Sequence, residues 1–270
     1  MKKRSTSKRR VVKRTANSAQ VVREIYYKLA RSWGPQHWWP AETPFEVIVG
    51  AILTQNTSWA NVERAMANLR GTAKLSIGGI RAIQLEELEQ LVRPSGYFRQ
   101  KAKRLKEFVA FVDARYNGSL DVMLATPTTQ LRKELLAQRG IGPETADSIL
   151  LYAGHHSIFV VDAYTRRVLE RHDAISAKAE YDEIRSLVED ALQSATPIKG
   201  GPAFDPQRPA VHGPSAMSTA AKSELAQTYN EMHGLFVQLG KHYCLKQNPK
   251  CEVCPLGPML KPRGHVKSQV

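Results

Sequence analysis

The sequence predicts an all-α fold. Hydrophobic residues recur at three- and four-residue spacing along most of the chain, and capping or turn residues separate these stretches. Only Ile158–Val161 is typical of an extended segment, and it is too short and isolated to imply a sheet. The 270 residues are enough for one or two domains with a sizeable buried core.

The individual helices follow from apolar spacing and boundary residues. Apolar side chains at helical spacing over 21–29 predict the first helix, and Gly34 follows as a stop. The segment Thr43–Glu46 predicts a capping box with proline at the first helical position, ahead of the apolar run 47–53. The further predicted helices are Trp59–Leu69, Leu85–Val92, Phe98–Tyr116, Thr128–Gln138, Pro143–Tyr152, Ala163–Arg171, Tyr181–Leu192 and Ser223–Leu239.

The positive charge is concentrated at the two ends of the chain. There are 39 Lys and Arg against 25 Asp and Glu, a net charge of +14. Residues 1–15 carry eight basic and no acidic side chains, and residues 257–270 carry three and none. Cationic tails suit a polyanion, most simply nucleic acid, through counterion release. A solvated tail that only aids solubility is the alternative.

Membrane and secreted classes are not expected. The longest apolar run, 47–53, is far shorter than a membrane span, and no apolar segment follows the charged N-terminus. We therefore expect a cytoplasmic, nucleoid-associated protein, with an organelle transit peptide as the alternative. The three cysteines all lie within 244–254, which argues against a disulfide framework and for a local metal or cluster site.

The predicted organisation has two helical domains between basic tails. A central helical barrel spans 42–155, and the second domain combines 17–41 with 156–260, including the cysteine loop 244–254. Residues 1–16 and 261–270 are the basic tails. The stretch 196–218 holds five prolines and little periodicity, so we expect a flexible insertion there.

The most informative stretch is a glycine turn between two predicted helices. Gly140-Ile141-Gly142 separates them, and Pro143 opens the second. Glycines allow close backbone approach, and the N–H groups at the new helix start can hold a phosphate, while Ile141 anchors the turn in the core. Thr145 lies in the first turn of the second helix. Alone, the turn fits an ordinary helix connection equally well.

About twenty residues further on, Asp162 stands where the apolar run 158–161 meets a predicted helix start. Asp at this place is a normal N-cap, worth roughly 0.5–2 kcal/mol. Its combination with the glycine turn instead favours a functional carboxylate between two helical domains.

Together these features resemble the helix-hairpin-helix DNA glycosylases, the endonuclease III superfamily. The hairpin, the segment 161–168 and the trailing cysteines follow in that family's order and spacing, over about residues 20–260 without the insertion. The resemblance implies a base-excision repair enzyme that flips a damaged base out of double-stranded DNA and hydrolyses its N-glycosidic bond. It assigns to Asp162 the family role of stabilising the oxocarbenium-like state.

Glu144 departs from the strand-cleaving members of this family. They have a lysine two residues after the second hairpin glycine, where this chain has Glu144. A carboxylate cannot form the Schiff base that β-elimination needs, so we predict a monofunctional glycosylase in which Asp162 assists attack by water. Glu144 then either orients water or base, or is a solvated acid at a helix start.

Three tryptophans lie on segments that flank one predicted helix. Core packing is the simple interpretation of Trp38, Trp39 and Trp59. The resemblance places the base pocket on these segments, and the Trp-Trp-Pro and Leu-Thr-Gln-Asn-Thr patterns are most similar to the 3-methyladenine DNA glycosylase III branch. Stacking a cationic alkylated purine on indole contributes on the order of 2 kcal/mol when desolvated.

Two further DNA contacts follow from the resemblance. Gln55 or Asn56 would fill the gap left by the flipped base, and the ungapped register favours Asn56. Lys101 and Lys103 lie in a predicted helix start that is mainly structural, where either could approach a phosphate.

The cysteine loop matches three ligands of the family's [4Fe-4S] site. Cys244, Cys251 and Cys254 have the family spacing, but Leu260 stands at the fourth position. Three alternatives follow: a cluster with a non-cysteine fourth ligand, a zinc site completed by a histidine such as His242, or a loop without metal.

The predicted function is therefore a monomeric, monofunctional DNA glycosylase acting on alkylated purines such as 3-methyladenine. One alternative is an endonuclease III-like glycosylase and AP lyase on oxidised pyrimidines, using another amine such as Lys241. The other is a non-enzymatic DNA-binding protein that uses the hairpin for phosphate contacts.

Overall fold

The computed structural model describes residues 16–193, 195 and 213–260. The predicted basic tails, apart from Ala16, and the predicted insertion up to residue 212 lie outside these residues. The described chain is built from helices and connecting turns and contains no strand, which confirms the all-α prediction. No helix within the described ranges is long and apolar enough to cross a membrane.

The elements follow one another along the chain with short connections. They are α1 (Ala16–Trp33), α2 (Pro44–Leu53), α3 (Trp59–Gly71), α4 (Ile77–Ala82), α5 (Leu85–Val92), η1 (Arg93–Ser95), α6 (Phe98–Tyr116), α7 (Leu120–Leu124), α8 (Thr128–Leu136), α9 (Pro143–Ser148), η2 (Ile149–Ala153), α10 (Ala163–Arg171), α11 (Tyr181–Leu192), α12 (Ala216–Thr219), α13 (Glu224–His242), η3 (Cys251–Val253) and η4 (Gly257–Met259). The element η2 is a π-helical turn that continues directly from α9.

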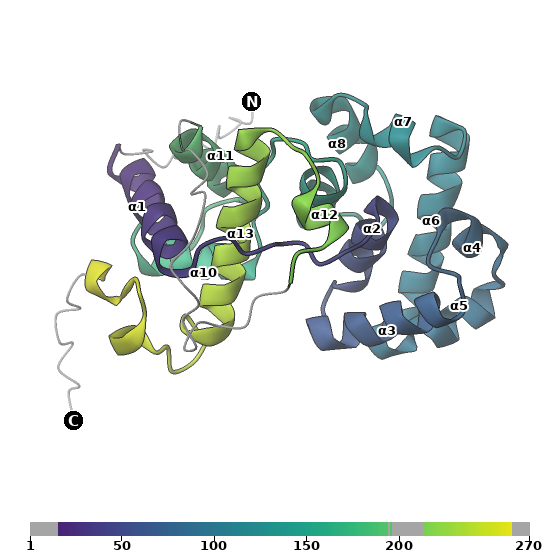
Figure 1. Cartoon of the computed structure of the whole chain (residues 1–270), viewed down its shortest axis with the longest axis horizontal. Coiled ribbons are helices and arrows are strands. Elements are labelled where there is room, and N and C mark those ends of the chain that lie inside the picture. Colours follow the sequence, from purple (N-terminus) through teal and green to yellow (C-terminus); the bar gives the residue numbers. More distant parts are fainter. Residues whose placement is uncertain (1–15, 194, 196–212, 261–270) are drawn as a thin grey trace, which may run out of the picture.

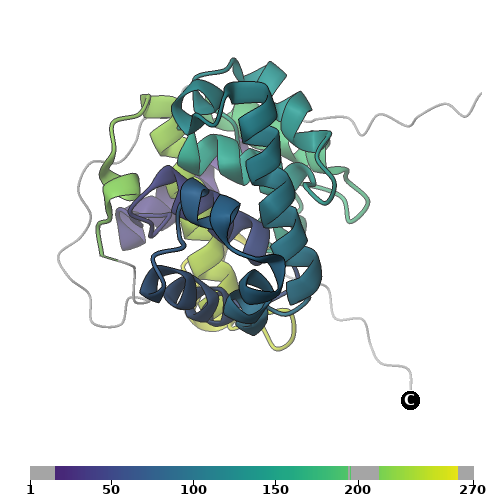
Figure 2. The same cartoon turned by 90° about the vertical axis from the view of Figure 1, so that its right-hand side faces the viewer.

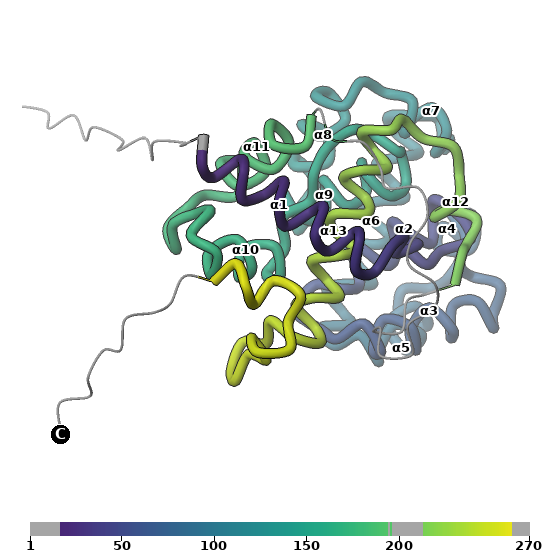
Figure 3. The backbone as a smooth tube through the Cα atoms, turned by 60° about the vertical axis from the view of Figure 1, so that its left-hand side comes forward, coloured from purple at the N-terminus to yellow at the C-terminus, as the bar shows by residue number. Residues whose placement is uncertain are grey.

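The helices form two groups that meet at η2. Figure 1 shows α2 to α8 on one side and α1, α10, α11 and α13 on the other. Figure 2 turns the first group toward the viewer, and the long helix α6 runs down this face. In Figure 3, α1 lies across α13, which also packs against α10 and α11. Both α2 and α13 contact η2. Residues of η2 are therefore in position to touch side chains from both groups.

Each group contains one helix that is buried almost throughout. In α2 every residue from Phe45 to Leu53 is buried, and in α13 the residues from Thr228 to Gly240 are all buried. The sequence explains the first, because 47–53 is apolar apart from Gly50. It explains the second less well, because α13 buries several polar side chains that each need a partner.

The start of α2 differs in detail from the predicted capping box. Thr43 Oγ1 accepts a hydrogen bond from the backbone N–H of Glu46, at 3.2 Å, as an N-cap should. The Glu46 carboxylate, however, accepts from the backbone N–H of Glu42 rather than from Thr43. The proline at the first helical position is confirmed.

The predicted flexible insertion ends earlier than residue 218. Ser215 caps the short helix α12 and accepts a hydrogen bond from Ser218 N. The Ser215 hydroxyl also donates to Trp39 O at 3.2 Å, and Met217 N donates to Ala41 O at 3.1 Å. The last residues of the predicted insertion are therefore packed against the segment that carries the first two tryptophans.

Lys101 is a structural residue. Its side chain is 1 % exposed, and Nζ donates to Leu53 O at 2.8 Å and to Ser95 O at 2.7 Å. The ammonium thus satisfies carbonyls at the end of α2 and in η1. Phosphate contact by Lys101 was a wrong prediction, because the side chain does not reach the surface. Lys103 is exposed, and its Nζ lies 3.8 Å from Glu107 Oε1.

Candidate active site

The hairpin lies between α8 and α9 and is shaped by Gly140. Its φ is +80°, a left-handed conformation that favours glycine, and a Cβ there would lie 2.2 Å from Arg104 Nε. Ile141 is buried and anchors the turn, as the sequence predicts. Gly142 precedes α9 in extended conformation, and Thr145 in the first turn is buried.

Gln55 and Asn56 follow α2 and face different surroundings. The Gln55 side chain donates to Gly140 O at 2.9 Å and to Thr145 Oγ1 at 3.0 Å, and its Oε1 accepts from Arg104. It therefore ties the end of α2 to the hairpin. Asn56 is exposed and has a φ of +54°, so it stands at the tip of this turn.

Asp162 is the N-cap of α10. Its backbone is extended, and its Oδ1 accepts from Thr165 N at 2.7 Å. The side chain is 13 % exposed, and Oδ2 lies 3.6 Å from Nε2 of His233 on α13. The close packing of α10 on α13 depends on Gly240, because a Cβ there would lie 2.1 Å from the Tyr164 ring. The N-cap interpretation and the functional one are thus compatible, since one carboxylate oxygen caps the helix and the other faces α13.

Glu144 lies in the first turn of α9, close enough to Asp162 for their charges to interact. The Glu144 side chain is exposed overall, while the neighbouring protein partly desolvates its carboxyl. This desolvation, together with the negative charge of Asp162, raises the pKa of Glu144 to about 7. A carboxyl group with a raised pKa therefore lies near a second carboxylate, an arrangement common at catalytic centres.

The three predicted tryptophans form one aromatic cluster. Trp39 lies 5.0 Å from Trp59, edge to face, and 5.3 Å from both Trp38 and Tyr152, measured between ring centroids. Trp38 and Trp39 are about 5 % exposed, whereas Trp59 is only half-buried. The cluster joins the two helix groups through Tyr152 of η2.

Three neighbours of this cluster were not expected from spacing. Tyr152 Oη lies 2.6 Å from His233 Nδ1, and His233 lies beside Trp38, at 6.4 Å between ring centroids. Lys241 Nζ lies 5.7 Å from the centroid of Trp38. The signal that could have indicated His233 is the row of polar residues on the buried helix α13, because each buried polar group needs a partner. Nothing in the sequence indicates that this partner is Tyr152.

The cysteine loop does not present a four-thiolate site. Cys244 is buried and Cys251 and Cys254 are half-buried, while Leu260 supplies no donor at the fourth position. Arg171 donates to Cys244 Sγ at 3.1 Å. The described ranges contain no group of three or more His, Cys, Asp or Glu placed to hold a metal ion, so a zinc site that His242 completes stays a prediction. The residues do not fit a four-thiolate [4Fe-4S] cluster.

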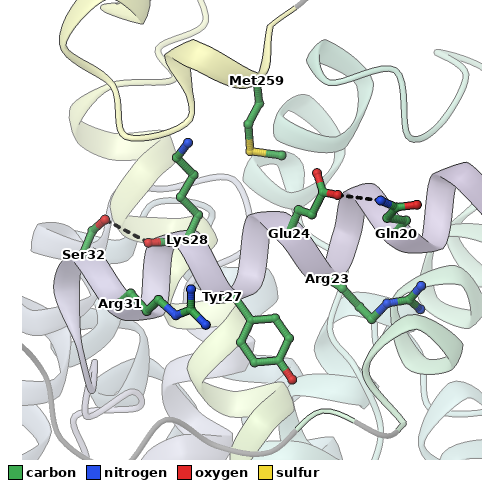
Figure 4. Close-up of a pocket in the computed structure, with 8 residues that line it drawn as sticks. All are labelled: Gln20, Arg23, Glu24, Tyr27, Lys28, Arg31, Ser32 and Met259. Carbon is green, nitrogen blue, oxygen red and sulfur yellow. Dashed lines mark hydrogen bonds between the residues drawn. The ribbon is translucent and has the colours of Figure 1, made fainter.

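A hollow on the surface is separate from this site. It runs along α1 and under Met259, and its cations are Arg23, Lys28 and Arg31 (Figure 4). It shares no residue with the tryptophan cluster or with the two carboxylates.

An all-helical fold that brings a glycine hairpin and a helix-capping carboxylate together defines the class of helix-hairpin-helix DNA glycosylases. The family model described as HhH-GPD superfamily base excision DNA repair protein matches residues 49–194. The chain belongs to this superfamily, the endonuclease III-like DNA glycosylases.

Individual relatives agree with this assignment. The chain is 40% identical over 242 residues to the Methanocaldococcus jannaschii protein named "Putative DNA repair glycosylase MJ1434", covering 89% of this chain and 96% of that protein. It is similar to the crystal structure of Helicobacter pylori 3-methyladenine DNA glycosylase (MagIII) bound to 1,N6-ethenoadenine, with 30% identity, a TM-score of 0.64, and 83% and 97% of the two chains covered. A trapped endonuclease III–DNA covalent intermediate shares the fold, with 22% identity, a TM-score of 0.67, and 90% and 95% coverage.

Proposed function

We propose that this DNA glycosylase is monofunctional and releases alkylated purines such as 3-methyladenine from double-stranded DNA. The observation that carries the proposal is the pairing of Asp162 with Glu144, a carboxyl rather than an amine, beside an aromatic cluster. The likeness to a 3-methyladenine glycosylase structure supports the substrate class. The proposal also includes association with the nucleoid and action as a monomer.

The chemistry requires few protein groups. Alkylation at a ring nitrogen makes the purine cationic, so the C1′–N bond breaks with its electron pair leaving on the base and needs little acid catalysis. The Asp162 carboxylate stabilises the positive charge that develops at the sugar. Water then bonds to C1′ and loses a proton to the carboxylate pair, with Glu144 orienting the water. The products are the free base and an abasic sugar.

The base would stack on the aromatic cluster. Trp59 is the most accessible of the three tryptophans, so it is the indole that a flipped base reaches first. Trp38 and Trp39 form the buried wall behind it. Indole faces favour a cationic base over its neutral parent, which gives selectivity for alkylation. Asn56, exposed at the tip of its turn, fills the gap in the duplex, and Gln55 holds the hairpin instead.

The test is base release from a duplex carrying alkylated purines, scored as strand breaks with and without alkali. Breaks that appear only after alkali are expected, because alkali cleaves abasic sites that a monofunctional enzyme leaves intact. Asp162→Asn is the matched control for contaminating nucleases. Breaks without alkali would overturn monofunctionality. DNA binding without any base release would overturn this substrate class and, if a panel of other lesions also fails, favour the DNA-binding module.

One observation favours a second candidate, AP lyase activity through Lys241. Its Nζ lies over the ring of Trp38, and burial lowers its pKa, while the charges of Glu63 and Asp162 act in the opposite direction. A lysine with a lowered pKa is a better nucleophile near neutral pH. Borohydride traps a covalent enzyme–DNA complex only if an amine forms the Schiff base, so a trapped product lost in Lys241→Gln would establish this candidate.

A further inference from the structure

His233 is a buried histidine that connects Asp162 to the junction between the two helix groups. It lies on α13 and is 4 % exposed. Its Nδ1 is 2.6 Å from Tyr152 Oη, and its Nε2 is 3.6 Å from Asp162 Oδ2. This Nε2 is a buried nitrogen with no hydrogen-bond partner among the described residues. A buried polar atom without a partner is costly, so its direction toward Asp162 needs an explanation.

The surroundings of His233 favour a proton on Nε2 over one on Nδ1. Burial lowers the pKa of His233, with the charge of Asp162 acting against this, so the ring has one N–H near neutral pH. Burial raises the pKa of Tyr152 well above its ordinary value, and the nearby carboxylates act in the same direction. Tyr152 therefore keeps its hydroxyl proton and can donate it to Nδ1. With Nδ1 accepting, the imidazole proton is on Nε2 and points at Asp162.

We propose that His233 is a positioning residue that fixes the carboxylate of Asp162 for attack on the sugar, and that Tyr152 sets the histidine tautomer required for this. The inference rests on the proposed catalytic role of Asp162. Thr165 N already holds Oδ1, at 2.7 Å, but this one bond leaves the plane of the carboxylate free to turn. A second donor at Oδ2 orients both oxygens. The 3.6 Å separation shortens to a hydrogen bond when DNA binds, because catalytic hydrogen bonds are often long before substrate is present.

The histidine tautomer can be measured without any substrate. Nitrogen NMR of the full-length protein labelled at histidine distinguishes an Nε2–H ring from an Nδ1–H ring or an imidazolium. The expected result at neutral pH is the Nε2–H tautomer for the signal that disappears in His233→Gln. In Tyr152→Phe we expect a mixture of tautomers, because the donor to Nδ1 is gone. An Nδ1–H ring or an imidazolium in the wild-type protein would overturn the proposal.

A pair of substitutions tests the effect on catalysis. In His233→Asn the amide stands at the position of Nδ1 and is too short to donate to Asp162. In His233→Gln the longer side chain brings the amide to the position of Nε2, where its nitrogen can donate to Asp162. We expect single-turnover base release to fall about 10²-fold in His233→Asn, with a substantially smaller loss in His233→Gln. Affinity for a duplex with an abasic-site analogue should not change in either variant. Thermal melts of both variants control for folding, and equal rates in the two would overturn the proposal.

Failure of this inference is distinguishable from failure of the proposed function. If Asp162→Asn releases base at the wild-type rate, the role of Asp162 itself is wrong. If Asp162→Asn is inactive while His233→Asn has the wild-type rate, Asp162 is catalytic and needs no positioning by His233. Only the second outcome is specific to the inference drawn from Tyr152 and His233.

Discussion

The hairpin site, which consists of the hairpin 140–142 with Glu144 and Asp162, differs from the cysteine loop in how its function could be lost. Around Asp162 the parts are held by contacts from several elements: an N-cap, the hydrogen bonds from Gln55 to the hairpin, and an aromatic cluster. In the cysteine loop a [4Fe-4S] site depends on the number of thiolates, and one position is Leu260. In our proposal the site defined by geometry keeps its function with Glu144 in place of a lysine, whereas a four-thiolate site cannot form with Leu260 at its fourth position.

The two regions are nevertheless connected. Arg167 on α10 donates to Cys244 O at 2.6 Å and to Gly240 O at 3.2 Å. Both carbonyls lie at the end of α13 or just beyond it, and Asp162 caps the start of α10. The loop can therefore support the helix that carries Asp162 through backbone carbonyls alone. This contact does not require any thiol to bind a metal.

The largest expected effect comes from Asp162→Asn. The substitution keeps an N-cap oxygen for Thr165 N but removes the negative charge, so base release should fall by at least about 10²–10⁴-fold. DNA affinity should remain, because the residue contacts no phosphate in our proposal. Single-turnover base release and binding to an abasic-site analogue check the two statements. A variant with the wild-type rate would show that the hairpin site is not where the chemistry takes place.

The second prediction adds the amine that the hairpin lacks. In Glu144→Lys a lysine takes the position beside Asp162, and we expect borohydride to trap a covalent complex with DNA that the wild-type protein does not form. Glu144→Gln is the matched control, since it removes the charge without adding an amine. If the wild-type protein is trapped as well, Lys241 becomes the candidate, and Lys241→Gln should then abolish trapping.

The sequence predicted the positions of these residues better than their contacts. The helices with full apolar periods were all found, whereas α4, α7 and α12 were missed because each has six residues or fewer and no complete pattern. Asp162 and Glu144 could be placed from the glycine turn and the helix starts, which are local signals. The bond from Tyr152 to His233 joins residues 81 positions apart, and no local signal specifies such a pair.

A third prediction concerns the stability of the helix group that carries the hairpin. Lys101→Met keeps the length of the side chain but leaves Leu53 O and Ser95 O without their donor. Each unsatisfied buried carbonyl is costly, so the free energy of unfolding should fall by about 1–3 kcal/mol. Urea titration measures this, with the exposed Lys103→Met as control. An unchanged urea midpoint would mean that the two carbonyls find water in place of the ammonium.

A fourth prediction is the pH dependence that Glu144 gives to stability. Its pKa is raised in the folded state to about 7. Between the ordinary pKa of a glutamate and a pH of about 7, the folded state therefore binds more protons than the unfolded state. The stability that comes from protonated Glu144 is lost as the pH rises through about 7. Because the side chain reaches solvent, we expect a modest slope that disappears in Glu144→Gln. Urea midpoints across this pH range measure it, and an identical slope in both proteins contradicts it.

The smallest effect is expected in the cysteine loop itself. If the loop supports α10 through Arg167 and backbone carbonyls, Cys254→Ser should leave base release and the melting temperature unchanged, and the wild-type protein should lack the visible absorption of an iron–sulfur cluster. Arg167→Met should lower the melting temperature, because it removes the donor to Cys244 O and Gly240 O. A brown protein that loses its colour and stability in Cys254→Ser would instead show a cluster with a fourth ligand other than cysteine. The loop would then depend on a metal cluster although it has only three thiolates. The number of thiolates would therefore not explain how the loop differs from the hairpin site.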